Sequence, residues 1–180
     1  CCLLPNISTA PATQTLTGPE VAALEVAMQD EYKARATYNR IMDTFGAVRP
    51  FSNIVQAEGM HVEALASLYR RYGVAIPADT WAEKVPAYSS LMEAAQAAVQ
   101  AELDNGALYD DILADVGNPE VRSVFTALRT ATMEHHLPAF QRFVAMQNGQ
   151  FNGPGMGRGQ GQGFGRGQGL GCQQGCFQGQ

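Results

Sequence analysis

The chain contains an internal repeat that places acidic and histidine side chains at matching positions. A glutamate, a tyrosine and a glycine recur at one fixed offset, with Glu31, Tyr38 and Gly46 matching Glu102, Tyr109 and Gly117. Farther along the chain, His61 corresponds to His136 at an offset that is four residues wider. Each half is therefore predicted to be a helix bearing a glutamate, a glycine-marked turn and a helix bearing a histidine.

The first half adds a Glu-x-x-His motif, Glu58 to His61. Residues three apart share a face of a helix, so both side chains can reach one ion. Glutamates from two helices, combined with Glu-x-x-His motifs from the other two, build two-metal carboxylate sites in four-helix bundles. Tyr38 and Tyr109 lie two turns beyond Glu31 and Glu102, where each hydroxyl can support a ligating carboxylate.

The second half departs from this pattern, because Met133 stands at the position that matches Glu58. Two acidic residues are candidates for the missing carboxylate. Glu134 is adjacent but lies about 100° around the helix, so it would have to be turned inward by a disturbance at Pro138. Asp110 lies two turns after Glu102 and is the other candidate.

Capping residues and apolar spacing predict four helices. Thr17 to Glu20 and Ser90 to Glu93 have capping-box spacing, and Pro50 and Asn118 open the other two helices. The predicted helices cover residues 19–45, 50–73, 90–117 and 118–147, and residues 74–88 form a long crossover. Pro138 is expected to kink the last helix. This pattern indicates an all-α protein, an antiparallel four-helix bundle with one long crossover.

The bundle is expected to occupy residues 18–148, between an extended N-terminal arm (residues 1–17) and a Gly/Gln-rich tail (residues 149–180). Every odd-numbered residue between Gly153 and Gly171 is glycine. In an extended form this period of two leaves one bare face that another backbone can approach closely. The same composition is also typical of a solvated, flexible tail.

All four cysteines lie outside the predicted helices, at Cys1, Cys2, Cys172 and Cys176. A start at cysteine rather than methionine indicates a processed chain, so we expect export to the cell surface or beyond, where disulfides form. A lipid anchor at Cys1 is a second interpretation. The cysteines are candidates for links within or between subunits, and Cys172 and Cys176 equally for a local disulfide or a small metal clip.

Charge and hydropathy exclude two classes of partner. The net charge of −5 argues against nucleic-acid binding, which requires a basic face. No apolar run approaches the roughly 18 residues of a transmembrane helix.

Buried carboxylates without a cation are costly, which favours two metal ions at the matched residues. Oxygen ligands with two histidines suit iron best, and also manganese, zinc or copper.

Several segments carry a family resemblance. Glu31-Tyr-Lys-Ala-Arg-Ala-Thr-Tyr38 and Ala57-Glu58-Gly-Met-His61 resemble rubrerythrins and other ferritin-like proteins. Three other segments resemble, more narrowly, an uncharacterised prokaryotic ferritin-like family that often carries a Gly-rich C-terminal extension. They are Phe51-Ser-Asn-Ile, Gly106-Ala-Leu-Tyr-Asp-Asp111 and His136-Leu-Pro-Ala-Phe140.

The resemblance covers roughly residues 18–147 and implies a ferritin-like bundle. It also implies a dimetal site with the ligands Glu31, Glu58, His61, Glu102 and His136. In the narrower family the pair aligned with Asp110 and Asp111 is usually acidic, which keeps Asp110 as a candidate. Met133 departs from the rubrerythrin pattern, and rubredoxin-like Cys-x-x-Cys pairs are missing from the sequence.

Two functions are compatible with these features. The first is an exported di-iron or related metal protein that oxidises ferrous iron or reduces peroxide, assembled into homo-oligomers through its termini. The second is a structural subunit of an extracellular filament, in which the metal site is structural or vestigial. An arm or tail laid on a neighbouring subunit would link such a polymer by strand addition.

Overall fold

Helices provide the regular structure of this chain. The computed structural model describes residues 4–149, and no strand occurs among them. In chain order the elements are α1 (Gly18–Phe45), α2 (Phe51–Tyr72), α3 (Leu91–Ala114), α4 (Pro119–Ala131), the π-helical turn η1 (Thr132–His136) and α5 (Leu137–Gln147). The predicted all-α class is confirmed, and a helix is present in each region where one was predicted.

Side-chain caps confirm the predicted starts of the first and fourth helices. At α1, the Thr17 hydroxyl accepts the amide of Glu20, and the Glu20 carboxylate accepts the amide of Thr17. At α4, the Asn118 side chain accepts the amides of Glu120 and Val121. These bonds satisfy amides that have no partner within the helix.

The third helix begins at its predicted cap but ends earlier than predicted. Ser90 accepts the amide of Glu93 as expected, but the Glu93 carboxylate accepts the amide and hydroxyl of Ser89, not the amide of Ser90. The helix ends at Ala114 rather than at Gly117. Gly117 therefore lies beyond the end of α3, and its amide donates to the Glu20 carboxylate on α1.

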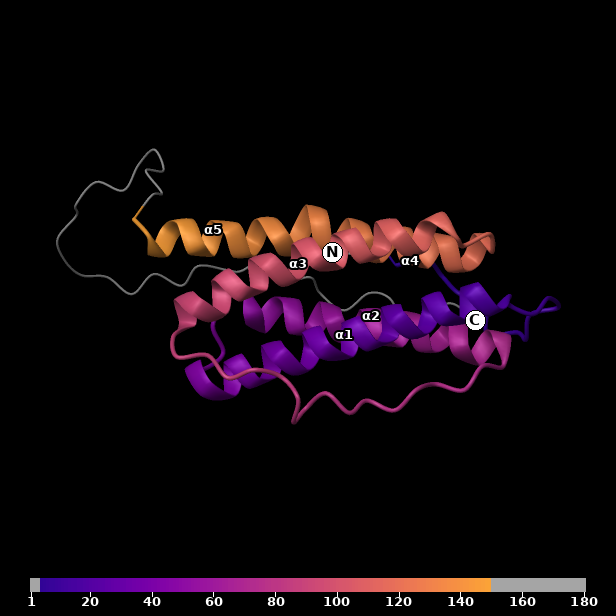
Figure 1. Cartoon of the computed structure of the whole chain (residues 1–180), viewed down its shortest axis with the longest axis horizontal. Helices are drawn as coiled ribbons and strands as arrows, with labels where there is room; N and C mark the ends of the chain where they lie inside the picture. Colours follow the sequence, from indigo (N-terminus) through magenta and orange to yellow (C-terminus); the bar gives the residue numbers. More distant parts are fainter. Residues whose placement is uncertain (1–3, 150–180) are drawn as a thin grey trace, which may run out of the picture.

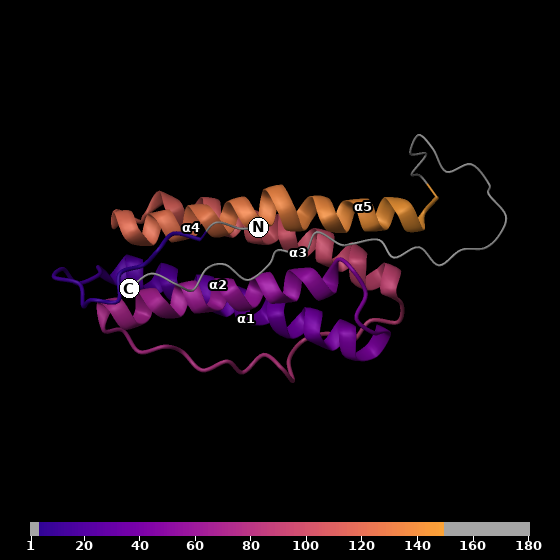
Figure 2. The ribbon, with the colours of Figure 1, turned by 180° about the vertical axis from the view of Figure 1, so that it is seen from behind.

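The helices form two layers that run along each other (Figures 1 and 2). One layer contains α1 packed on α2, and the other contains α3 packed on the continuous rod α4–η1–α5. The crossover of residues 73–90 returns along the length of the bundle, so α3 runs parallel to α2. Tyr32 and Trp81 hold this crossover against α1, through hydrogen bonds to the Pro77 carbonyl and to Gln29.

The apolar core is divided into two clusters. One contains Leu24, Met28, Leu65, Leu68, Phe125 and Leu128, and the other contains Ile41, Phe51, Ile54 and Phe140. Along each helix, buried polar residues occur between the members of the two clusters. A buried polar layer is costly unless its charges are paired or bind a metal, so this layer is the place to look for function.

The rod α4–η1–α5 changes its helical geometry at η1. The amide of Leu137 donates to the carbonyl of Thr132, five residues back, as in a π-helix. Pro138 follows at the first turn of α5 and has no amide to donate to Glu134. The helix is therefore irregular just before Pro138, where it has a π-turn, and the kink predicted at Pro138 stays a prediction.

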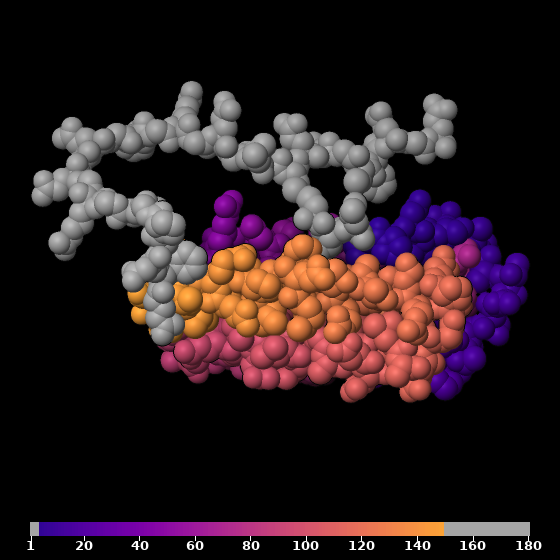
Figure 3. All heavy atoms as spheres, turned by 90° about the horizontal axis from the view of Figure 1, so that it is seen from above, coloured from indigo at the N-terminus to yellow at the C-terminus, as the bar shows by residue number. Residues whose placement is uncertain are grey.

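Residues 4–17 form an arm without helix or strand that covers one end of the bundle (indigo in Figure 3). Leu4, Ile7 and Leu16 pack against the first apolar cluster. The Arg71 side chain holds the arm by donating to the Ala10 carbonyl at 2.5 Å. The arm thus belongs to the packed structure of the domain.

Within residues 4–149, the helices lack the combination of length and apolar character needed to cross a bilayer. The predictions for the alternating-glycine tail and for Cys1, Cys2, Cys172 and Cys176 lie outside the described residues.

Candidate metal centre

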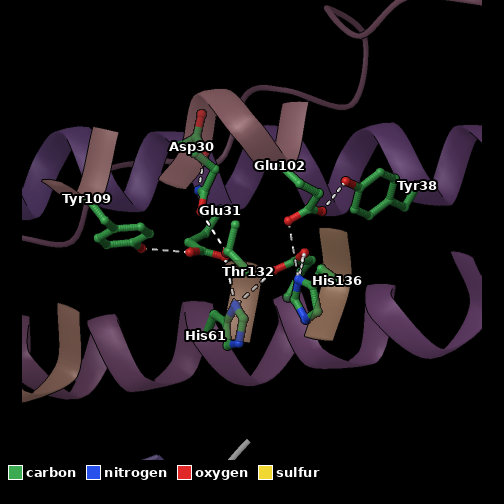
Figure 4. Close-up of polar contacts among 10 residues, drawn as sticks. Asp30, Glu31, Tyr38, His61, Glu102, Tyr109, Thr132 and His136 are labelled. Atoms are coloured by element: carbon green, nitrogen blue, oxygen red, sulfur yellow. Dashed lines mark hydrogen bonds and ion pairs between the residues drawn. The ribbon is translucent and has the colours of Figure 1, made fainter. Parts of the chain in front are cut away.

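Five side chains from both layers converge in the buried polar layer (Figure 4). None of them is more than 3% exposed. They are Glu31 on α1, Glu58 and His61 on α2, Glu102 on α3 and His136 on η1. These are the five residues that the repeat and the resemblance single out, and the structure brings all of them together.

The five side chains form two groups that share Glu58. In the first group, Nδ1 of His61 lies 3.1 Å from Glu31 Oε2 and 2.9 Å from Glu58 Oε2. In the second, Nδ1 of His136 lies 3.2 Å from Glu58 Oε1 and 3.5 Å from Glu102 Oε2. Glu58 therefore presents one oxygen to each group.

The geometry of each group fits a metal ion. In both, one imidazole nitrogen and two carboxylate oxygens lie within 4.8 Å of one another. Ligand bonds of about 2.1 Å allow three such atoms to reach one ion after small side-chain rotations. The rings of His61 and His136 stack with centroids 5.4 Å apart, so the two groups are direct neighbours.

The two outer carboxylates are each held by a tyrosine, and the pairing crosses between the halves of the chain. Tyr38 on α1 donates to Glu102 on α3 at 2.5 Å, and Tyr109 on α3 donates to Glu31 on α1 at 2.7 Å. Both tyrosines are fully buried. Hydroxyl donors of this kind orient a ligating carboxylate.

Burial and the imidazoles distribute protons unevenly over the three carboxyl groups. Burial raises the pKa of Glu31 to about 7, aided by Glu58 and opposed by His61. Burial also raises the pKa of Glu102. Burial acts on Glu58 in the same direction, but hydrogen bonds and charges from His136 and His61 outweigh it and lower the Glu58 pKa. In the metal-free protein, Glu58 is thus the carboxylate that stays ionised.

Beside the centre lies a polar chain that sequence reasoning missed. The Asn105 amide donates to Asp30 at 2.5 Å, and its oxygen accepts the Thr132 hydroxyl at 2.7 Å. The chain joins α1, α3 and η1 (Figure 4). One signal was available in the sequence: Asn105 lies three residues after Glu102 and so shares its helix face.

The π-turn decides which residue shares the face of His136. In an α-helix a residue three positions earlier lies about 60° away around the axis, whereas at about 4.4 residues per turn it lies about 115° away and a residue four positions earlier only about 33° away. Thr132 is 2% exposed, whereas Met133 is half-buried and Glu134 is exposed. Thr132, rather than Met133, therefore occupies the place where the repeat leads one to expect a fourth carboxylate.

The two acidic substitutes are not part of either group, which corrects the expectation for both. Glu134 is exposed because the π-turn directs Thr132 and His136 inward. Asp110 is exposed on α3 and accepts two hydrogen bonds from Arg129, at 2.5 and 3.0 Å. This ion pair holds the pKa of Asp110 below its ordinary value.

Met133 packs against α3 at a glycine. A Cβ atom added to Gly106 would lie 2.3 Å from the sulfur of Met133, closer than any ordinary contact. The absence of a side chain at Gly106 therefore leaves the space that the Met133 side chain fills.

A cavity of about 350 Å³ lies between α1, α3 and the end of the crossover. Its innermost residues include Glu58 and Glu102 of the second group, together with Thr132. Glu31 and the two histidines do not line it. The second group therefore faces this cavity.

Comparisons with known proteins support the fold only. The chain matches no protein-family model and no curated protein. The fold of this chain is similar to the crystal structure of hypothetical protein MJ0754 from Methanococcus jannaschii DSM 2661, with a TM-score of 0.69 and 18% sequence identity. The match covers 77% of this chain and 87% of that chain. At this identity, the similarity shows a shared helical architecture.

Proposed function

We propose that this chain is a ferritin-like protein whose bundle holds two metal ions, one in each Glu/His group. The observation that carries the proposal is Glu58, which presents one oxygen to each group from a buried position. A carboxylate placed in this way can bridge two ions. The two-layer bundle with one long crossover is also the arrangement of ferritin-like folds.

The ion we favour is iron. Each group offers two carboxylate oxygens and one imidazole nitrogen. Such a donor set, rich in oxygen and without thiolates, suits iron or manganese. Iron would supply redox chemistry with dioxygen or peroxide. The protein's own contribution would be to fix the two outer carboxylates, Glu102 and Glu31, through Tyr38 and Tyr109.

Metal content and iron oxidation test this proposal. Metal-free protein is titrated anaerobically with Fe²⁺, and bound iron is measured after gel filtration. Two ions per chain, followed by oxidation faster than in free solution when oxygen or peroxide is added, would support a ferroxidase or peroxide-reducing protein. Two bound ions without accelerated oxidation would leave a structural metal site, and no bound ions would refute the proposal.

A second function, a structural subunit of an extracellular filament, is favoured by the alternating-glycine segment and by cysteines confined to sequence positions 1, 2, 172 and 176. In this proposal the termini join one subunit to the next, with or without metals in the bundle. Electron microscopy of native material, with and without reductant, tests it. Discrete particles under both conditions would exclude the polymer.

A further inference from the structure

The cavity beside the second group has the shape of a small ligand site. At its outer end are Lys33 and Ala101, both exposed, and at its inner end are Glu58 and Glu102. Its volume of about 350 Å³ lies at the lower end of the range for small-molecule sites.

Part of the cavity wall is made by small apolar side chains. Ala34 on α1 and Ala97 and Ala98 on α3 leave the space open, and Pro86 and Tyr88 of the crossover close one side. An apolar body of a few carbon atoms fits such walls. The cavity is therefore suited to a molecule with a short apolar part.

The inner end lacks one anionic ligand. Each group supplies three ligands, fewer than the four to six that divalent transition metals bind. Two divalent ions bring four positive charges, and the three carboxylates balance three of them. One positive charge is then left without an anionic ligand in either group, since the other acid nearby, Asp30, lies in the cavity wall and accepts a hydrogen bond from Asn105. Thr132 occupies the place where a fourth carboxylate was expected and leaves room for an external one.

We propose that the cavity binds a short-chain aliphatic monocarboxylate, with its carboxylate at the ion held by Glu58, Glu102 and His136 and its alkyl chain between the alanines. This inference rests on the proposed metal centre, because the head group needs the ion. The ligand would supply the carboxylate that the chain itself lacks.

The charges around the cavity make binding depend on the metal. Asp30 and Asp104 also line it, and they accept hydrogen bonds from Asn105 and Gln100. Lys33 is the lysine at the mouth. Without metal, the carboxyl groups around the cavity repel an anion. The two divalent ions would reverse the sign of the charge at the inner end of the cavity. A cationic molecule of the same length should prefer the metal-free protein, and a neutral one should bind the loaded and metal-free forms equally.

Butyrate, butanol and butylammonium are the probes for this test. The protein is first loaded with Mn²⁺, and two bound ions per chain are verified by elemental analysis. Calorimetry then measures each probe against loaded and metal-free protein. We expect butyrate to bind the loaded protein at least about tenfold more tightly than the metal-free protein, and more tightly than either other probe. Equal binding to both forms, or tighter binding of butanol, would overturn the proposal.

The orientation of the probe is tested by paramagnetic relaxation from Mn²⁺. The carboxyl carbon of butyrate should relax faster than its methyl carbon, since the head lies nearer the ion. Faster relaxation at the methyl carbon would contradict the proposed binding mode. If neither Mn²⁺ nor Fe²⁺ binds, the metal centre is refuted before any probe is added, and if only Fe²⁺ binds, the same calorimetry is done with Fe²⁺-loaded protein under anaerobic conditions, so the two failures are distinguishable.

Ala97→Leu fills the cavity wall, and Ala107→Leu is its matched control on the exposed face of α3. Ala97→Leu should weaken butyrate binding at least about tenfold while two Mn²⁺ ions remain bound, and the control should bind as the native chain does. If Ala97→Leu does not fold, Ala101→Leu at the mouth replaces it. Unchanged butyrate affinity in the folded blocking variant would place the ligand elsewhere and overturn the proposal.

Discussion

Glu58→Gln tests whether one carboxylate serves both metal ions. Glu58 is 3% exposed, and its two oxygens lie 2.9 Å from His61 and 3.2 Å from His136. Glutamine keeps the size of the side chain but removes the charge in a place that solvent does not screen. Loss of one partner of a buried charged pair costs about 2–5 kcal/mol, which corresponds to roughly 30- to 4,000-fold in a binding constant. We expect a loss in this range at both ions.

The assay is calorimetric titration of metal-free protein with Mn²⁺. Glu31→Gln is the comparison, because Glu31 belongs to the first group alone and its loss should weaken one ion much more than the other. Glu63→Gln is the control, since Glu63 is an exposed residue on the same helix that pairs with Arg70. Thermal unfolding in a chelator verifies that each variant folds.

Two results would refute the reasoning. If Glu58→Gln weakens one ion and leaves the other at native affinity, the carboxylate is not shared. If it behaves like Glu63→Gln, the buried groups do not bind metal through this residue.

Three further predictions follow from individual contacts. Tyr109→Phe should weaken metal binding about 10- to 100-fold at the first group alone, and Tyr38→Phe at the second alone, as measured in the same titration; equal losses at both ions would contradict the crossed pairing. Because the pKa of Glu31 is raised to about 7, its carboxyl is protonated below that pH, and apparent metal affinity should fall at least about tenfold per pH unit as the pH drops below about 7. Titrations at a series of pH values test this, and an affinity that does not change with pH would disprove it. Gly106→Ala should lower the free energy of unfolding by about 1 kcal/mol, since overpacking against Met133 outweighs the gain in helix propensity. Denaturation curves should show a smaller loss when Met133→Ala is also present, and equal losses in both backgrounds would exclude the clash.

Much of this architecture could be predicted from local sequence signals. The caps at Thr17 and Asn118 have short-range causes, because a side chain and an amide two or three residues away are enough to form them. The candidate ligands Glu31 and Glu102 could be identified because a glutamate at the same place in two apolar stripes is unusual. The chain itself provided this internal comparison.

The errors occurred where the helix departed from the α period. Counting three residues back from His136 pointed to Met133, but the π-turn places Thr132 on that face. Pro138 indicated a disturbance without indicating its form. Asp110 was misplaced for a different reason, since its partner Arg129 lies on another helix and the contact depends on how the two helices pack.

Features formed between helices were also out of reach. The seven-residue spacing showed that Tyr38 and Tyr109 could support carboxylates, but not that each would support the carboxylate of the other half. The cavity depends on small side chains from α1 and α3 facing each other beside the crossover. Only a three-dimensional arrangement brings these segments together.

The crossed tyrosines make the two helical hairpins depend on each other. A fragment spanning residues 18–72 would contain Glu31, Glu58 and His61 but no hydroxyl for Glu31, and a fragment spanning residues 91–147 would lack the donor for Glu102. Expressed separately, the fragments should capture metal poorly, and mixing them should restore capture only as they dock. Metal uptake would then report on complementation between two pieces of a duplicated chain.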